Sequence, residues 1–190
     1  MKLEKLKTEF LAQNVLYYEN LESTQILAKE LSQKNTQNGS IVIAKNQTNG
    51  QGTHGKKWLT CSNKNATFTL ILYPNCNINK MTNLSIIIAE SIQRAIKNEY
   101  GIKLQIKEPN DLIYNNRKIA GILTEIATRE EQVEKLYIGI GFNVNQTEFD
   151  REIENKAISL KMITGKNEKI EDVISIICNE LEEIIKNRTS

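Results

Sequence analysis

The sequence predicts an α+β fold in which a mixed or antiparallel sheet is flanked by helices. Short apolar and β-branched runs separated by turn residues indicate strands, and most of these runs cluster between residues 104 and 145. Two longer stretches with apolar residues at helical spacing lie outside this cluster. Segregated helices and strands are typical of α+β domains, whereas doubly wound α/β domains alternate them. At 190 residues the chain fits a single domain, 1–190.

The N-terminal part is predicted to form a strand followed by a helix. Val15–Leu21 has the composition of a short strand. Ser23 and Thr24 follow it and offer an N-cap for a helix that runs to about Lys34, because hydroxyl oxygens accept bonds from the free N–H groups of a first helical turn. The two hydroxyls are therefore expected at a strand-to-helix corner.

Two buried strands and a long loop come next. The strands are expected at Ile41–Ala44 and Ala66–Tyr73, and the glycine-interrupted segment from Asn46 to Lys57 between them reads as a loop. A helix with an apolar stripe is expected from about Thr82 to Asn98.

The remainder of the chain is predicted to form a meander of antiparallel strands closed by a helix. The expected strands are Leu104–Lys107, Asp111–Tyr114, Lys118–Ala127 and Lys135–Asn145. Polar turns join them at Asn115-Asn116 and at residues 128–132. The segment from Lys169 onward carries apolar residues at helical spacing and is expected to cover the core.

Composition limits the class of protein. Cys61, Cys76 and Cys178 are odd in number and form no C-x-x-C pair, so they read as free thiols of a reducing cytoplasm rather than as a disulfide or metal framework. No segment has the roughly 20 apolar residues that a membrane span needs. We therefore expect a cytoplasmic protein with no membrane contact.

Net charge is small, but its distribution is uneven. The formal charge is +2, whereas dedicated nucleic-acid binders carry a basic surplus on one face, so no specific DNA binding is expected. Residues 31–89 contain six lysines and no carboxylate, so this block would favour an anionic ligand. A chance gap in acidic residues is the alternative explanation.

A glycine-rich segment in this block matches G-x-G-x-x-G at Gly50, Gly52 and Gly55. The dinucleotide reading fails, because that fingerprint must open a helix, and here two lysines and Trp58 follow. Two interpretations remain: the tip of a glycine-rich hairpin, or backbone that approaches a ligand closely while Lys56 adds charge for phosphate. His54 in this segment reads as an exposed loop residue more readily than as a general base.

Three further segments combine polar residues with glycine or proline in strands. They are Lys107-Glu108-Pro109-Asn110-Asp111, Arg117 to Glu125, and Ile138 to Asn145. In the second, Lys118 enters an otherwise apolar strand near Gly121, and a glycine inside a strand often marks close approach by a ligand. Each segment alone also fits ordinary turn or strand chemistry.

Taken in order, these segments resemble the catalytic domain of biotin protein ligases. The resemblance rests on Ser23-Thr24-Gln25, Gln47-x-x-Gly50-x-Gly52-x-x-Gly55-x-x-Trp58, Lys107-x-Pro109-Asn110-Asp111, Lys118-x-Ala120-Gly121-Ile122-Leu123-x-Glu125, Gly139-x-Gly141-x-Asn143-Val144-Asn145 and Ala157-Ile158-Ser159-Leu160. It covers roughly residues 15–185. It implies a fold like that of class II aminoacyl-tRNA synthetases.

The resemblance also implies an activity. Such a ligase would use ATP and Mg²⁺ to convert biotin to biotinyl-5'-AMP, releasing pyrophosphate. It would then form a C–N bond to a lysine of a biotin carboxyl carrier protein. A monomer or homodimer is expected.

Site residues follow from the resemblance by position. Lys118 and Lys56 would be catalytic, with Lys118 holding the biotin carboxylate against the α-phosphate. The biotin-binding residues would be Ser23, Thr24, Gln25, Gln47, Gln51, Gly52, Thr53, Trp58, Lys118, Gly121 and Gly141. The ATP and adenylate would contact Lys56, Lys107, Asn110, Asp111 and Asn143, with Asp111 serving Mg²⁺.

The sequence departs from the family pattern in its glycine loop. The family pattern G-R-G-R-x-G-R has Gln51, Thr53 and Lys56 in place of its arginines here. Two alternatives to a biotin ligase stay open: a lipoate or octanoate protein ligase or transferase of the same fold, and a non-catalytic biotin-binding relative. Only about 14 residues precede the first strand, so an N-terminal winged helix is not expected, nor is a C-terminal small β-barrel.

Overall fold

A mixed sheet forms the centre of the molecule. The computed structural model describes residues 1–189. The sheet's strands are β1 (Val15–Leu21), β2 (Ser40–Gln47), β5 (Asn65–Leu72), β6 (Cys76–Asn77), β7 (Gln105–Lys107), β8 (Asp111–Tyr114), β9 (Arg117–Arg129) and β10 (Gln132–Asn143). Their order is β1-β2-β5-β10-β9-β8-β7, with β6 paired to β10. Only β1 and β2 are parallel; the other pairs are antiparallel.

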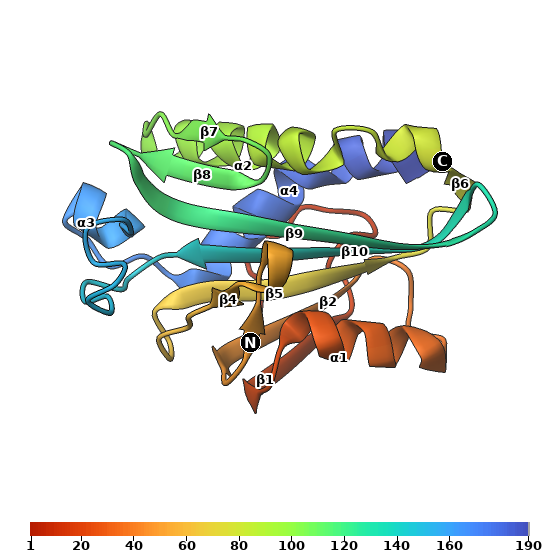
Figure 1. The fold of residues 1–190 in the computed structure, drawn as a ribbon, viewed down its shortest axis with the longest axis horizontal. Helices are drawn as coiled ribbons and strands as arrows, with labels where there is room; N and C mark the ends of the chain where they lie inside the picture. The colour runs from red at the N-terminus through yellow and green to blue at the C-terminus, as the bar shows by residue number, and fades with distance from the viewer. Residues whose placement is uncertain (190) are drawn as a thin grey trace.

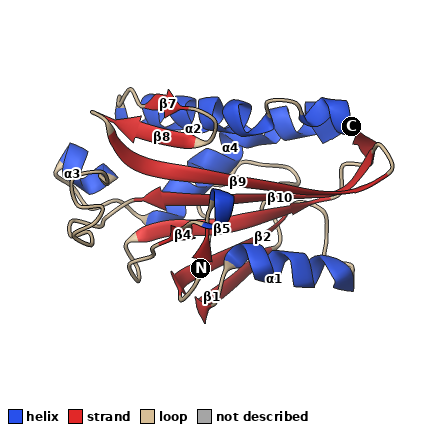
Figure 2. Cartoon of the chain, viewed as in Figure 1, coloured by secondary structure: helices blue, strands red, loops and turns tan. Residues whose placement is uncertain are grey.

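Helices cover both faces of this sheet (Figures 1 and 2). The helices are α1 (Thr24–Leu31), α2 (Leu84–Tyr100), α3 (Leu160–Thr164) and α4 (Ile170–Thr189), of which the short α3 lies beyond the end of β10 and not over a face. Helices α2 and α4 run along one face. Helix α1 lies on the other face and connects the parallel strands β1 and β2 along the chain (Figure 1). The predicted α+β class is confirmed.

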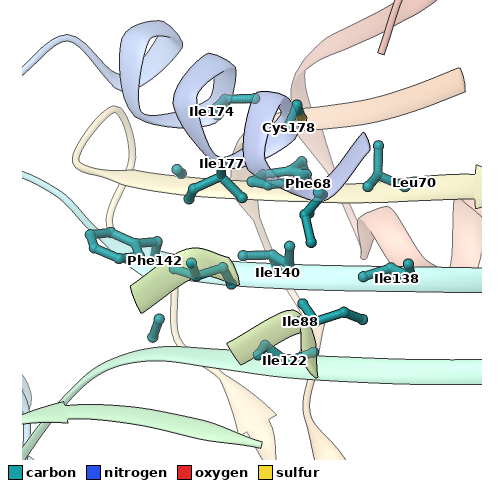
Figure 3. Packing of buried hydrophobic residues seen from close by; sticks show 14 of the residues in the cluster. Phe68, Leu70, Ile88, Ile122, Ile138, Ile140, Phe142, Ile174, Ile177 and Cys178 are labelled. Atoms are coloured by element: carbon teal, nitrogen blue, oxygen red, sulfur yellow. The ribbon is translucent and has the colours of Figure 1, made fainter. Parts of the chain in front are cut away.

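Strand alternation separates a core face from a second face. In β10, Ile138, Ile140 and Phe142 point into the main core with Phe68 and Leu70 of β5, against α2 and α4 (Figure 3). The residues between them alternate to the face that carries α1. That second face holds only a small apolar cluster of Ala28, Val42, Ile71 and Tyr137, extended by partly buried neighbours. Thr67 and Thr69 of β5 and Gly139 and Gly141 of β10 also lie on this face, where they line a pocket.

Most predicted elements are present, with shifted ends. Ser23 is the N-cap of α1, and its hydroxyl accepts a bond from Gln25 N at 3.3 Å. Asn115 and Asn116 both have positive φ, as a tight hairpin turn requires. The helix expected from Thr82 begins at Leu84 and ends at Tyr100, and Gly101, with a φ of +71°, is its C-cap. The strand expected to end at Ala127 continues to Arg129.

Some elements were not predicted. The segment expected as a loop between Asn46 and Lys57 contains regular structure: β3 (Gly50–Gln51) and β4 (Lys57–Trp58), of two residues each, pair as a hairpin around a short 3-10 turn. The short strand β6 and the five-residue helix α3 were also missed. These elements are too short to show a periodic pattern.

Among the contacts that join the N-terminal segment to α4, the carboxylate of Glu182 is the most buried. Glu182 is 7% exposed and accepts bonds from the backbone N–H groups of Glu9, Phe10 and Leu11 at 2.8 to 3.2 Å. Burial disfavours the charged carboxylate, but these N–H groups outweigh it and lower the pKa of Glu182 below 4.5. These hydrogen bonds to the N-terminal segment therefore depend on ionised Glu182.

We expect Glu182→Gln to lower the free energy of unfolding by about 1–3 kcal/mol, since hydrogen bonds to charged groups are stronger than neutral ones. The lowered pKa also sets a pH dependence: the stabilisation is present above pH 4.5 and is lost as the pH falls through the pKa of the folded protein. Urea unfolding of both proteins between pH 3 and pH 7 measures this. A stability gap of the same size at pH 3 would contradict the role given to the charge.

Candidate active site

A pocket of about 120 Å³ opens on the α1 face of the sheet, beneath the β3–β4 hairpin. It brings together segments far apart in the sequence: the start of α1, the end of β2, the hairpin and the middle of β9 and β10. Its walls include every residue that the resemblance assigns to biotin: Ser23, Thr24, Gln25, Gln47, Gln51, Gly52, Thr53, Trp58, Lys118, Gly121 and Gly141.

A second pocket, of about 330 Å³, lies beside the first. Three residues expected at the nucleotide end, Lys107, Asp111 and Asn143, line it. Three residues, Lys57, Trp58 and Lys118, line both pockets and mark the junction between them. The other two nucleotide candidates, Lys56 and Asn110, line the first pocket instead.

Glycines make room in the floor of the first pocket. A Cβ on Gly141 would lie 2.3 Å from Cε2 of Trp58, and a Cβ on Gly139 would lie 2.6 Å from Oε1 of Gln25. The rigid indole of Trp58 occupies space that only glycine at position 141 leaves free, whereas a side chain at position 139 would require the amide of Gln25 to shift.

A β-bulge brings Lys118 and Gly121 to the same side of the sheet. Residues three apart in a regular strand face opposite sides. Here the register shifts, because Leu112 pairs with Ala120 but Ile113 pairs with Lys118, which leaves Ile119 as an extra residue. A Cβ on Gly121 would consequently lie 3.0 Å from Lys118 Nζ.

Two side chains lie close to the ammonium of Lys118 at the junction. Its ammonium lies 2.6 Å from Oδ1 of Asp111 and 5.7 Å from the centre of the Trp58 ring. The backbone on either side is also fixed, because Lys118 N donates to Lys156 O and Ile158 N donates to Lys118 O. The cation is thus held in place while its side chain stays 37% exposed toward the pockets.

The polar end of the first pocket is a set of fixed hydrogen bonds. Gln47 Oε1 accepts from the backbone N–H of Thr24 at 2.7 Å, and its Nε2 donates to Thr60 Oγ1 at 3.3 Å. Thr69 Oγ1 lies 2.9 Å from Thr24 Oγ1 and 3.1 Å from Gln25 Oε1. Gln25 Nε2 donates to Glu125 Oε2 at 2.7 Å.

The two asparagines expected near the adenylate are bound to the protein itself. Asn110 donates to Ile122 O at 2.9 Å and lies 3.4 Å from Thr53 Oγ1. Asn143 donates to Ile158 O at 3.1 Å and accepts from Asn65 at 2.8 Å. These contacts show that both amides hold neighbouring backbone in place.

Sequence reasoning missed several pocket residues. Thr67 and Thr69 of β5 line the first pocket, and Phe149, Ile153 and Lys156 line the second. The signal for the threonines was present, since two polar residues alternate with apolar ones in an otherwise buried strand. The segment of residues 147–157 carries no regular pattern and gave no signal.

Three further observations concern a free donor in the pocket, metal ions and membranes. Trp58 Nε1 is buried without a hydrogen-bond partner among the described residues, which leaves a donor for a bound molecule. Within residues 1–189 there is no group of three or more His, Cys, Asp or Glu side chains that could hold a metal ion. Nor does any helix in that range combine the length and apolar character that crossing a membrane requires.

Comparisons with known proteins agree with this geometry. The profile described as the Biotin/lipoate A/B protein ligase family matches residues 17–143. The "Bifunctional ligase/repressor BirA" of Bacillus subtilis (strain 168) is 38% identical over 163 residues, covering 85% of this chain and 50% of that protein. The human "Biotin--protein ligase" is 32% identical over 152 residues, covering 76% of this chain and 21% of that protein.

Solved structures agree as well. The "Biotin protein ligase from Aquifex aeolicus in complex with biotin and ATP" superposes with a TM-score of 0.79 at 29% identity, covering 92% of this chain and 71% of that one. The chain spans about half the length of the Bacillus relatives that it matches. The matched profile spans both pockets' strands and most of their lining residues, and the chain therefore belongs to the biotin/lipoate A/B protein ligase family.

Proposed function

We propose that this protein is a biotin protein ligase that activates biotin with ATP and transfers it to a lysine of a biotin carboxyl carrier protein. The observation that carries the proposal is the position of Lys118, which lies where the two pockets meet. Two carboxylate- or phosphate-bearing substrates bound in the two pockets would bring their reacting ends together at this cation. The relatives named as biotin protein ligases, one of them solved with biotin and ATP, support this assignment.

The first pocket suits the ring system of biotin. Its polar end offers both acceptor and donor groups through Thr24 and Gln47, as a cyclic urea requires, because a buried urea without partners costs a few kcal/mol. Trp58 and the glycine floor provide an apolar wall for the rest of the molecule. The biotin carboxylate would then extend toward Lys118.

Activation joins the biotin carboxylate to the α-phosphorus of ATP. A carboxylate oxygen forms the new bond, the bond from that phosphorus to the bridging oxygen breaks, and pyrophosphate leaves. Lys118 would offset the repulsion between the two anions and stabilise the charge that develops on the phosphoryl oxygens. Lys56 and Lys107 would add positive charge along the phosphates.

Asp111 is the one predicted contact to Mg²⁺. A single carboxylate beside a phosphate site fits this ion, which usually keeps water ligands and is held by one or two carboxylates together with substrate phosphates. When bound, Mg²⁺ would neutralise phosphate charge.

Transfer needs only a neutral lysine amine from the carrier. The amine attacks the acyl carbon of biotinyl-5'-AMP, AMP leaves, and an amide forms. No covalent intermediate with this protein is required. We infer that the reaction takes place in the cytoplasm, which the three free cysteines support.

We expect biotin and Mg-ATP together to raise the melting temperature more than either does alone, because a tightly held adenylate stabilises the folded state by mass action. Trp58 is the single tryptophan, so its fluorescence reports binding in the first pocket directly. Released pyrophosphate separates an enzyme from a non-catalytic biotin-binding relative. Equal responses to biotin, lipoate and octanoate would overturn the substrate assignment, since the latter two lack a urea.

A further inference from the structure

The buried amide of Asn65, the first residue of β5, contacts a residue that lines the second pocket. Its side chain lies on the same face of the strand as Thr67 and Thr69, but it lines neither pocket itself. Asn65 is 2% exposed and stands directly opposite Asn143 of β10 in the sheet register. Its hydrogen bonds therefore serve the protein and not a ligand.

The direction of these hydrogen bonds is fixed. The backbone N–H of Cys61 can only donate, and it holds Oδ1 of Asn65 at 2.9 Å. The NH₂ group of Asn65 then faces the other way, where it donates to Oδ1 of Asn143 at 2.8 Å and to Oε1 of Gln146 at 2.9 Å. Both hydrogens of this group are therefore used inside the protein.

Asn143 passes the direction on to the backbone that carries Lys118. Because the oxygen of Asn143 is bound to Asn65, its NH₂ group faces the opposite side. There it donates to Ile158 O at 3.1 Å and lies 3.5 Å from Lys118 O. Ile158 N in turn donates to Lys118 O at 2.9 Å. The orientation of Asn143 thus decides whether the carbonyl groups beside Lys118 meet a donor or an acceptor.

Gln146 passes the same direction on to a wall of the second pocket. Its oxygen accepts from Asn65, so its NH₂ group donates to Glu148 O at 2.8 Å. Phe149 follows directly in the chain and lines the second pocket. Asn143 and Gln146 are only 5% and 8% exposed, so little water reaches them to replace Asn65 as their donor.

We propose that Asn65 is a positioning residue for formation of the adenylate. It touches no substrate and acts through Asn143 and Gln146, which hold the backbone beside Lys118 and one wall of the second pocket. The proposal rests on the proposed function, because it assigns the second pocket to ATP. Neither Asn65 nor its hydrogen-bond partners line the first pocket, so the expected effect falls on ATP and on the rate, and not on biotin.

Asn65→Asp tests the proposal, because it removes the donor without changing the size of the side chain. One carboxylate oxygen still accepts from Cys61 N, but the other has no hydrogen to give to Asn143 or Gln146. Asn143 would then turn its NH₂ group to the new carboxylate and its oxygen to Ile158 O. Two acceptors would face each other there, and the backbone beside Lys118 would move.

We expect Asn65→Asp at pH 8 to bind Mg-ATP roughly tenfold or more weakly and to form the adenylate roughly tenfold or more slowly. The dissociation constant for biotin should stay within about twofold of that of the unaltered protein, since the Cys61 contact is kept. Calorimetric titration with each ligand measures binding. Pyrophosphate release under saturating substrates measures the rate.

A pH profile separates positioning from a general loss of structure. Burial and two facing carbonyl oxygens raise the pKa of the new carboxyl group. The hydrogen-bond partners of Asn65 among residues 1–189 are all uncharged, so the carboxyl has no cation to hold it ionised. Its protonated form carries an O–H donor again. Lowering the pH to 6 should therefore bring the ATP affinity of Asn65→Asp back toward that of the unaltered protein at the same pH, a ratio that cancels titration of the nucleotide.

Asn145→Asp is the matched control. Asn145 also bonds to backbone through both ends of its amide, to Glu168 N at 2.9 Å and to Glu168 O at 2.7 Å, and it lines neither pocket. Its ATP affinity and rate should equal those of the unaltered protein at both pH values.

Equal weakening of biotin and ATP in Asn65→Asp, without recovery at pH 6, would mean a purely structural role and would overturn the proposal. Unchanged ATP binding and rate in this variant would remove the role of Asn65 and leave the proposed function standing. If the unaltered protein released no pyrophosphate, the proposed function would fail and this role with it.

Discussion

Lys118→Ala is expected to lower the rate of biotinyl-5'-AMP formation by about a hundredfold to a thousandfold. That range is typical when one preorganised group that stabilises transition-state charge is removed. The loss should appear mainly in kcat, because charge on the phosphoryl oxygens grows during the reaction while the ring of biotin remains held at the far end of the pocket. Pyrophosphate release under saturating biotin and ATP measures it.

The fold should survive this change. Lys118 and Asp111 form an ion pair that is partly exposed, with side-chain exposures of 37% and 25%, and such pairs contribute about 0–1 kcal/mol. Lys97→Ala, at an exposed position on α2, is the control for loss of one lysine charge. Near-normal turnover in Lys118→Ala, equal to that of the control, would show that the reacting atoms do not meet at this junction.

The fold was largely predictable because its strands and helices carry strong local patterns. The apolar spacing of the helix from Lys169 and the Ser23 cap of α1 each have a direct physical cause, and both are confirmed. The parallel pairing of β1 with β2 was not predicted, because the sequence of a strand does not specify which other strand it pairs with. Pairing depends on how α1 returns the chain across the sheet.

The site was predictable in composition but not in geometry. The motif residues identified which side chains meet, and the structure brings them around two adjoining pockets. The bulge at Ile119 could not be predicted, because it arises from the register between β8 and β9. Glu125 lay inside a recognised motif, yet the residue that donates to it, Gln25, is 100 residues away in the sequence.

The hairpin over the first pocket shows how local order depends on distant contacts. It has only two paired positions, Gly50 with Trp58 and Gln51 with Lys57, and isolated hairpins of this size are unstable. Here the Gly50 backbone lies against Gln47, and Trp58 lies against Gly141 of β10. These contacts supply the stability that the local sequence lacks, so the segment read as a loop from sequence alone.

The arginine-poor hairpin leads to the second large expected effect, a slower release of the adenylate in a Gln51→Arg, Thr53→Arg double variant. Gln51 is exposed at the mouth of the first pocket, and Thr53 lies 3.4 Å from Asn110, so both positions can present a longer side chain to a bound phosphate. Neutral hydrogen bonds are about half as strong as charge-assisted ones. If each arginine contributes about 1 kcal/mol more than the residue it replaces, the adenylate should dissociate roughly thirtyfold more slowly.

Stopped-flow fluorescence of Trp58 during displacement of biotinyl-5'-AMP by excess biotin measures that rate. The unaltered protein should release the adenylate faster and, for that reason, biotinylate nearby non-carrier lysines more than the double variant does. A Gln37→Arg, Gln105→Arg protein gains the same charge at exposed positions outside both pockets and should match the unaltered protein. Equal dissociation rates in all three proteins would mean that Lys56, Lys57 or backbone N–H groups of the hairpin already hold the phosphate, because added charge at the mouth would then have no unmet interaction to satisfy.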